Sequence, residues 1–172
     1  MSGFGHTGPR SSEPGFDLVA QAMGGMMAIT GFPDGPPTKA GPSIADFIAG
    51  LYSAVAILAA LKYRLETGIG QSIDISMQDC IWAITAIESA GFYFLTGENP
   101  PRFGNSILGG VTPFSVYPAE DGYVVICAPT VGMFENFLRV MGREDLLGVE
   151  GYSNIAERTN QREEVDALVE EW

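Results

Sequence analysis

Apolar residues recur at helical spacing in three stretches of the first part of the chain. The longest stretch covers residues 44–66 and predicts one long helix with an apolar face. Two other stretches predict helices over residues 16–30 and 77–95, and the pair Gly24-Gly25 weakens the middle of the first. On the long helix we expect six large apolar residues to form the buried stripe: Ile44, Phe47, Leu51, Val55, Leu58 and Leu65.

Alternating apolar and polar residues predict strands elsewhere. Residues 72–76 place Ile73 and Ile75 on one face of a half-buried strand. Residues 112–128 predict two strands joined around Asp121 and Gly122, which is a hairpin sequence.

Two further helices are predicted after the hairpin. The first carries apolar residues at positions 134, 137, 138 and 141 and stops at Gly142. The second is predicted to begin at Asn160 as N-cap, with Glu163 three residues later. We expect its apolar face to consist of Val165, Leu168, Val169 and Trp172.

The character of the sequence changes at Pro100. Residues 1–100 are rich in helical patterns, whereas residues 101–172 combine a hairpin with helices in a small α+β arrangement, so we predict a fold of the α/β class in two parts. Both ends look like cuts, since the first residues resemble the exit of a strand and the last helix stops at Trp172 on an apolar face. We therefore expect an internal piece of a longer chain.

Composition narrows the range of partners. The 172 residues are 46% hydrophobic and carry a formal net charge of −12, and the nine Lys and Arg residues are scattered, which argues against nucleic acid or an anionic membrane surface. The run from Ile44 to Leu61 is long enough to suggest a membrane span, but Asp46, Gly50 and Ser53 within it argue against one.

The two cysteines and the N-terminal residues indicate in which cellular compartment the protein is expected. Cys80 and Cys127 have no metal-ligand or redox spacing, and we expect both to be buried structural thiols. The first residues show no secretory signal. A reduced, cytoplasmic location is the expectation that follows.

Several common active sites are excluded by the residues that they require. His6 is the one histidine, so no multi-histidine metal site is possible, and no metal site is expected. The chain contains neither G-x-S-x-G nor G-x-x-x-x-G-K-[ST]. Residues 3–8 match G-x-G-x-x-G, but Pro9 and a loop follow where a dinucleotide site needs a helix.

Asp46 is the one acid within the apolar run, where an ionised carboxylate is costly to bury without compensation. The pattern Ser43-x-x-Asp46 fits a helix start, at which the helix dipole stabilises the acid and keeps it ionised. Small residues on the same face, namely Ala49, Gly50 and Ser53, would let a ligand or another helix come close. Asp46 is therefore either a helix-end accessory or a carboxylate nucleophile, and both interpretations stay open on these grounds.

Six segments of the chain read SGFGHTGP, PGFDLVAQAMGGMMAITG, DGPP, SIADFIAGLYSAVAILAAL, TGIGQSIDISMQD and GGVTPFSVYPAEDGYVVICA. Together they resemble the family III CoA-transferases, also called the CaiB/BaiF family, of the formyl-CoA and carnitine CoA-transferase type. They occur in the family's order and cover nearly the whole chain, although the family's chains are much longer. The resemblance implies that residues 1–100 are the central part of the large CoA-binding and catalytic domain, without its N-terminal nucleotide-fold segment. Residues 101–172 would then be a linker and part of the small α+β domain.

The resemblance also implies site residues. Asp46 would be the catalytic aspartate, which attacks an acyl-CoA thioester to form a mixed anhydride and then carries CoA as an aspartyl thioester to an acceptor carboxylate. Coenzyme A and acyl-CoA would be substrates, with no permanently bound cofactor. Phe4 and Met77 match residues at the family's CoA site. Gly109 and Gly110 fall where some members have a glycine-rich loop over the aspartate, and as a pair they fit an ordinary turn equally well.

Three alternatives follow for the activity. The family's racemase branch carries a His where this chain has Phe16, and a phenyl ring cannot transfer a proton. This favours transfer of CoA from acyl-CoA to a small carboxylic acid over an acyl-CoA racemase or epimerase. The third alternative is an inactive fragment in which Asp46 only caps a helix. The resemblance implies an interlocked homodimer for the full-length protein, so we expect apolar faces to be exposed here and the isolated chain to be inactive.

Overall fold

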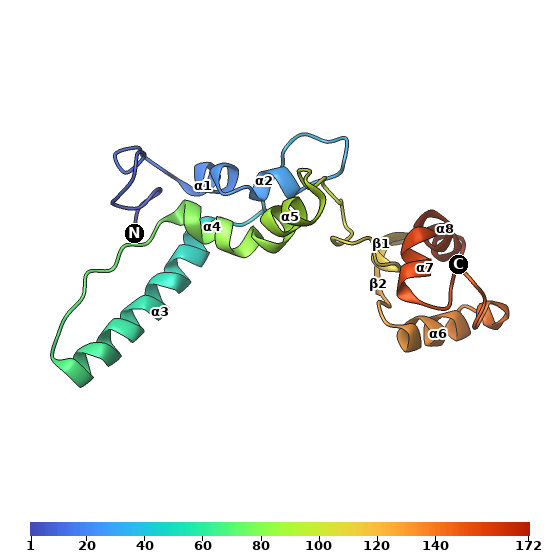
Figure 1. Cartoon of the computed structure of the whole chain (residues 1–172). Helices are drawn as coiled ribbons and strands as arrows, with labels where there is room; N and C mark the ends of the chain where they lie inside the picture. Colours follow the sequence, from blue (N-terminus) through green and yellow to red (C-terminus); the bar gives the residue numbers. More distant parts are fainter. The chain divides into compact units, whose positions relative to one another are not determined.

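The chain folds into helices and one small sheet, and the computed structural model describes residues 1–172. It divides into two compact units, Met1–Arg102 (unit 1) and Phe103–Trp172 (unit 2). The helix-rich character with a small sheet confirms the predicted fold class. Unit 1 contains α1 (Asp17–Met23), α2 (Met26–Ile29), α3 (Ile44–Thr67), α4 (Met77–Thr85), η1 (Ile87–Gly91) and α5 (Phe92–Thr96) (Figure 1). Unit 2 contains β1 (Phe114–Ala119), β2 (Gly122–Cys127), α6 (Val131–Val140), η2 (Glu144–Leu146), α7 (Ile155–Asn160) and α8 (Arg162–Glu171).

The glycine pair divides the helix predicted over residues 16–30 into α1 and α2, so the prediction of one helix is wrong there. Gly25 has a φ of +89°, a left-handed conformation that glycine adopts without steric cost. Gly24 lies tightly against α4, because a Cβ at this position would come within 2.5 Å of the Ile81 side chain. The pair therefore ends α1 where it packs on α4 and turns the chain into α2.

Helix α3 begins and ends close to its predicted bounds, but the predicted buried stripe is wrong. The large side chains of that stripe are mostly bare: Phe47 is 67% exposed and Leu65 is 87% exposed. Near the start of α3, α1 and α4 pack against its opposite face, whereas the end of α3 extends beyond them (Figure 1). That less exposed face carries small residues at a spacing of three to four: Ala45, Ala49, Ser53, Ala56 and Ala60.

By length and composition alone, α3 is also the one helix of the chain that is apolar enough to cross a membrane. Helices that other protein segments cover can be equally apolar all round. The bare outer face of α3 confirms the expectation that apolar surface is exposed in this chain.

Residues 72–76 form no strand, so that prediction is wrong. Their one ladder contact is an isolated parallel bridge between Ser2 and Ser76. A strand needs a series of such residue pairs, whereas here Ser2 alone pairs with this segment, at Ser76. The alternation of faces is nevertheless present, because Asp74 is more exposed than the isoleucine on either side of it.

The helix predicted over residues 77–95 is present but not uniform, since it runs through α4, η1 and α5. The turn η1 is π-helical: the Gly91 N–H donates to the Ala86 carbonyl, five residues earlier, at 2.8 Å. Gly97, in the left-handed conformation, ends α5. Apolar periodicity does not predict the extra residue of a π turn.

The two thiols lie in different surroundings. Cys80 is buried in α4, where burial and the neighbouring Asp79 raise the pKa of its thiol, and the prediction of a buried thiol is confirmed. Cys127 ends β2 and is exposed, so the same prediction is wrong for it. Most of β2 is open to solvent, which explains the difference.

The predicted hairpin is confirmed in unit 2. Strands β1 and β2 pair antiparallel, from Phe114 opposite Cys127 to Ala119 opposite Gly122. The helix predicted next is α6, whose Phe134 is buried in the core of the unit together with Ala128, which follows β2, and Val165 of α8.

The predicted start of the last helix is wrong, because α8 begins at Arg162 and Asn160 is the final residue of α7. The side chain of Asn154 caps α7 instead, accepting a hydrogen bond from the Glu157 N–H at 3.0 Å. In the predicted apolar face of α8, Val165 and Val169 are buried, Leu168 is half-buried and Trp172 is mostly exposed.

Arg158 is fully buried in unit 2, with 0% of its surface exposed. Its guanidinium donates to the Thr112 carbonyl at 3.0 Å and to the Pro129 carbonyl at 2.9 Å, and it lies 4.5 Å from the centre of the Phe134 ring. Its Nη1 has no hydrogen-bond partner. Burial lowers the pKa of this arginine, because the charged form loses its hydration.

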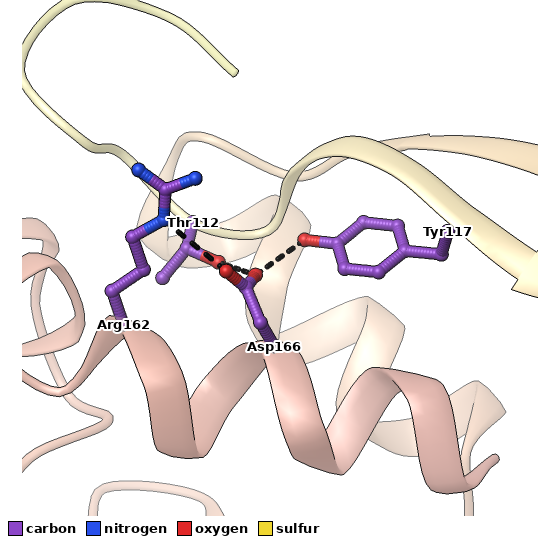
Figure 2. A network of polar contacts seen from close by, with 4 residues as sticks. All are labelled: Thr112, Tyr117, Arg162 and Asp166. Atoms are coloured by element: carbon purple, nitrogen blue, oxygen red, sulfur yellow. Dashed lines mark hydrogen bonds and ion pairs between the residues drawn. The ribbon is translucent and has the colours of Figure 1, made fainter. Parts of the chain in front are cut away.

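A second polar cluster joins α8 to the hairpin (Figure 2). The Asp166 carboxylate accepts hydrogen bonds from the Thr112 hydroxyl at 2.5 Å, from the Tyr117 hydroxyl at 2.6 Å and from Arg162 at 3.2 Å. Burial and the bond to Asp166 raise the pKa of Tyr117 far above its ordinary value, so the phenol stays neutral and donates.

Candidate active site

Asp46 lies in the first turn of α3, and its carboxylate is exposed to solvent. It makes no hydrogen bond and no ion pair with the rest of the chain. The carboxylate borders an open hollow of about 650 Å³ that five residues line: Ser43, Asp46, Phe47, Gly50 and Leu51. An unpaired carboxyl group next to the apolar side chains of Phe47 and Leu51 is therefore the main chemical feature of this hollow.

The small residues near Asp46 do not all face this hollow. Gly50 lines it, whereas Ala49 is buried in the core of unit 1 and the Ser53 hydroxyl donates to the Ala49 carbonyl at 2.7 Å. Of the two interpretations, close packing with other helices is therefore the one that holds for Ala49, and neither Ala49 nor Ser53 lines the hollow. At Gly50 the approach to Asp46 is open, since nothing lies within 4 Å of where a Cβ would be.

Ser43 is the N-cap residue of α3, but its side chain forms no capping hydrogen bond, so the predicted cap is wrong. The carboxylate of Asp17 in α1 takes that role and accepts from the Ala45 N–H at 2.9 Å. Gln21, one turn further along α1, donates to the second oxygen of Asp17 at 2.8 Å and accepts from the Ala40 N–H at 2.9 Å. Sequence reasoning missed this pair; their spacing of four residues on one helix face was the available signal.

The turn that carries Asp46 rests on the core of unit 1. Ala45 and Ala49 are fully buried and belong to one cluster with Ala20 of α1 and with Met77 and Ile81 of α4. Because alanine side chains are short, α3 approaches the other two helices closely at this end. The exposed carboxylate is thereby carried by a turn that belongs to the hydrophobic core of unit 1.

Of the residues predicted to bind CoA, Met77 is 5% exposed and lies in that core cluster. Phe4 is half-buried, and the Arg10 guanidinium lies 5.8 Å from the centre of its ring. Phe4 and Arg10 line a separate hollow of about 290 Å³, which shares no lining residue with the hollow at Asp46. A role of Phe4 and Met77 in CoA binding stays a prediction.

Gly109 and Gly110 belong to unit 2 and are described with it. Both have positive φ angles, +89° and +67°, and the Gly110 N–H donates to the Ile107 carbonyl at 3.2 Å. These features are those of a turn that requires glycine. Whether the pair also covers Asp46 stays a prediction. No group of three or more His, Cys, Asp or Glu side chains is arranged to hold a metal ion.

The whole chain, residues 1–172, matches the family model described as CoA-transferase family III. The chain is 41% identical over 164 residues to the succinyl-CoA:mesaconate CoA-transferase of Haloarcula marismortui, which covers 95% of this chain and 40% of that protein. It is 35% identical over 169 residues to the succinate–glutarate CoA-transferase of Agrobacterium fabrum, covering 98% of this chain and 42% of that protein.

Solved structures give the same picture of the fold. A crystal structure of a CaiB/BaiF family protein from Brucella suis matches with a TM-score of 0.80 at 38% identity, covering 99% of this chain and 44% of that one. A hypothetical protein from Mycobacterium tuberculosis matches with a TM-score of 0.80 at 25% identity, covering 98% and 44%. The chain thus spans about two fifths of the length of the relatives that it matches.

Proposed function

Since the chain belongs to CoA-transferase family III, we propose that it supplies the catalytic aspartate, Asp46, to an enzyme that moves coenzyme A from an acyl-CoA to a free carboxylic acid. The chain is then the central part of a longer protein. The observation that carries the proposal is the unpaired Asp46 carboxylate, which borders an open hollow at the start of α3, where Ala45 and Ala49 of that helix are buried.

The reaction uses the Asp46 carboxylate as a nucleophile. One of its oxygens attacks the thioester carbonyl carbon, the C–S bond breaks, and CoA leaves as a thiolate while a mixed anhydride forms. The thiolate then attacks the aspartyl carbonyl, which releases the donor acid and leaves an aspartyl-CoA thioester. The acceptor carboxylate repeats both steps in reverse order, so that Asp46 is regenerated with no net proton transfer.

The surroundings of Asp46 suit a covalent carrier. The carboxylate has no partner that would have to be displaced before attack. Gly50, one turn further along the helix, leaves space for the acyl group, and Phe47 and Leu51 provide apolar walls.

Small dicarboxylic acids are the proposed substrates. The names of the matched relatives specify succinate, glutarate and mesaconate, with succinyl-CoA as a donor. No observation favours the racemase alternative, because Phe16 offers no proton-transfer group.

We further propose that the full-length protein is a cytoplasmic homodimer whose partner covers the bare face of α3, and that the isolated chain is inactive. The exposed Phe47, Leu51 and Leu58 side chains support an apolar partner surface, and the net charge of −12 disfavours a strong hold on the phosphates of CoA. We therefore expect the isolated chain to bind CoA weakly, if at all, and a micromolar affinity of the 172-residue chain for CoA in titration calorimetry would contradict this expectation.

Trapping of the intermediate tests the role of Asp46. The full-length protein that contains this chain is incubated with succinyl-CoA and then with hydroxylamine, which converts an activated aspartyl group into a hydroxamate, and mass spectrometry locates the modified peptide. We expect modification at Asp46, and a loss of turnover of at least about a thousandfold in Asp46→Asn. The control is Asp34→Asn, an exposed loop acid. Unchanged turnover in Asp46→Asn would refute the proposal.

A further inference from the structure

Two side chains of α1 hold the segment that leads into α3 at two points. Asp17 accepts from the N–H of Ala45, and Gln21 accepts from the N–H of Ala40, both at 2.9 Å. The bond from the Gln21 amide to the second oxygen of Asp17, at 2.8 Å, joins the two contacts into one network. Residues 41–44 therefore connect two residues, Ala40 and Ala45, whose N–H groups are both held by side chains of α1.

These contacts are rigid because α1 is itself fixed in unit 1. Gln21 is 0% exposed, so its amide has little freedom to exchange these partners for water. At its C-terminal end α1 packs on α4, where the Thr85 hydroxyl donates to the Gly24 carbonyl at 3.2 Å and Ile81 lies against Gly24. Because α1 is fixed against α4, its side chains hold the start of α3 in a defined position relative to the core of unit 1.

The Asp46 carboxylate has no hydrogen bond of its own, so no side-chain contact holds it, and the main chain of its turn sets the region that the carboxylate can reach. Asp46 directly follows Ala45, whose N–H is the one that Asp17 binds. Any rotation of this turn would move the carboxylate relative to the hollow that it borders. The Ser43 side chain, which could have fixed the turn locally, makes no capping bond.

We propose that Asp17, supported by Gln21, is a positioning residue for the reaction at Asp46: it fixes the first turn of α3 so that the carboxylate faces the hollow. This inference rests on the proposed function of Asp46. Asp17 acts through an oxygen that accepts from Ala45 and not through contact with the reacting atoms.

The test compares three variants of the full-length protein. Asp17→Ala removes the acceptor, and we expect kcat to fall about 10- to 100-fold with little change in the KM for acyl-CoA, because a displacement of about 1 Å is enough for such a loss. Asp17→Asn retains an oxygen for the Ala45 N–H but places its own amide nitrogen opposite the Gln21 amide nitrogen, so it should recover only part of the rate. Gln21→Leu keeps the buried volume but removes the second fixed point, and should cause a smaller loss than Asp17→Ala.

Controls separate this inference from the proposed function and from unfolding. Asp34→Ala, in an exposed loop, should leave kcat unchanged, and thermal denaturation should show every variant folded at the assay temperature. Amide hydrogen exchange should become faster at Ala40 in Gln21→Leu and at Ala45 in Asp17→Ala. If Asp17→Ala does not fold, Gln21→Leu and Asp17→Asn still decide the question.

Three results would overturn the inference while leaving the proposed function intact: full activity in Asp17→Ala, an equal loss in Asp17→Asn and Asp17→Ala, or a change confined to KM. An equal loss would mean that the charge of Asp17 matters and not its capping oxygen. Full activity in Asp46→Asn is the separate result that defeats the proposed function.

Discussion

Replacement of the buried Arg158 tests whether a guanidinium without a counter-charge stabilises unit 2. Burial of such a charge costs several kcal/mol, because the charged group loses its hydration. The structure offers three compensating contacts: hydrogen bonds to the Thr112 and Pro129 carbonyls and the face of the Phe134 ring. Arg158→Met retains most of the volume and removes the charge together with both donors.

The expected magnitude follows from what is left behind. Thr112 is 1% exposed, so its carbonyl would lose its partner without access to water, at a cost of about 1–3 kcal/mol. Pro129 is half-buried, and its carbonyl can be hydrated at a lower cost. Loss of the contact with Phe134 adds about 1–2 kcal/mol, and relief of the buried charge offsets part of the total. We expect Arg158→Met to destabilise unit 2 by about 2–3 kcal/mol and Arg158→Lys, which can reach one carbonyl, by less.

Urea denaturation followed by the fluorescence of Trp172 measures this difference in free energy. Trp172 lies 5.6 Å from the Phe137 ring in unit 2, and Trp82→Phe removes the second tryptophan, which lies on the surface of unit 1. An Arg158→Met variant as stable as its parent, or more stable, would refute the reasoning. It would show that the desolvation of the charge outweighs its contacts with the carbonyls and the ring.

The remaining predictions concern two glycines and one carboxylate. Gly24→Ala should destabilise unit 1 by about 1–3 kcal/mol in thermal denaturation, because the new methyl group would lie within 2.5 Å of Ile81, and a variant of unchanged stability would contradict the close packing of α1 on α4. Gly50→Ala should instead stabilise α3 by about 0.5–1 kcal/mol, since the position is helical and open, yet lower turnover in the full-length protein by filling the hollow at Asp46. Hydrogen bonds from Ser153 and from the Gly151 N–H hold the pKa of Glu157 below its ordinary value. The ionised Glu157 therefore stabilises the folded state fully at a pH above the ordinary pKa, and this contribution is lost as the pH falls through the lowered pKa of the folded state. Glu157→Gln should flatten this loss in denaturation curves below about pH 4.3, and an unchanged acid limb would contradict it.

The sequence predicts the extent of α3 and of the hairpin well, because helical periodicity and strand alternation are local properties. It does not predict which face of α3 is buried. That helix is apolar nearly all round, so its large residues give no contrast with a polar face, and the small residues that pack against α1 and α4 are not recognisable as a contact surface.

At the candidate site, too, local sequence patterns predict some features and miss others. Asp46 is identifiable from its isolation in an apolar run, and the structure places it at the helix start where the pattern puts it. The hydrogen bond that caps this turn is donated by the Ala45 N–H and accepted by Asp17, which lies 28 residues before Ala45 in the chain. A contact of that kind leaves no local pattern, whereas the Ser43 motif is present and makes no capping bond. Residues 72–76 likewise have the alternation of a strand without the neighbours that make one.

The π turn η1 has a consequence for how this part of the chain can vary in evolution. A π turn holds one residue more than an α turn, and its i→i+5 hydrogen bond puts the Gly91 N–H where an α-helix has the residue before it. Deletion of one residue within Ile87–Gly91 would therefore give a regular helix and leave Tyr93 and Phe94 facing the same way relative to α4. This part of the chain can lose or regain a single residue without turning either aromatic ring away from its neighbours.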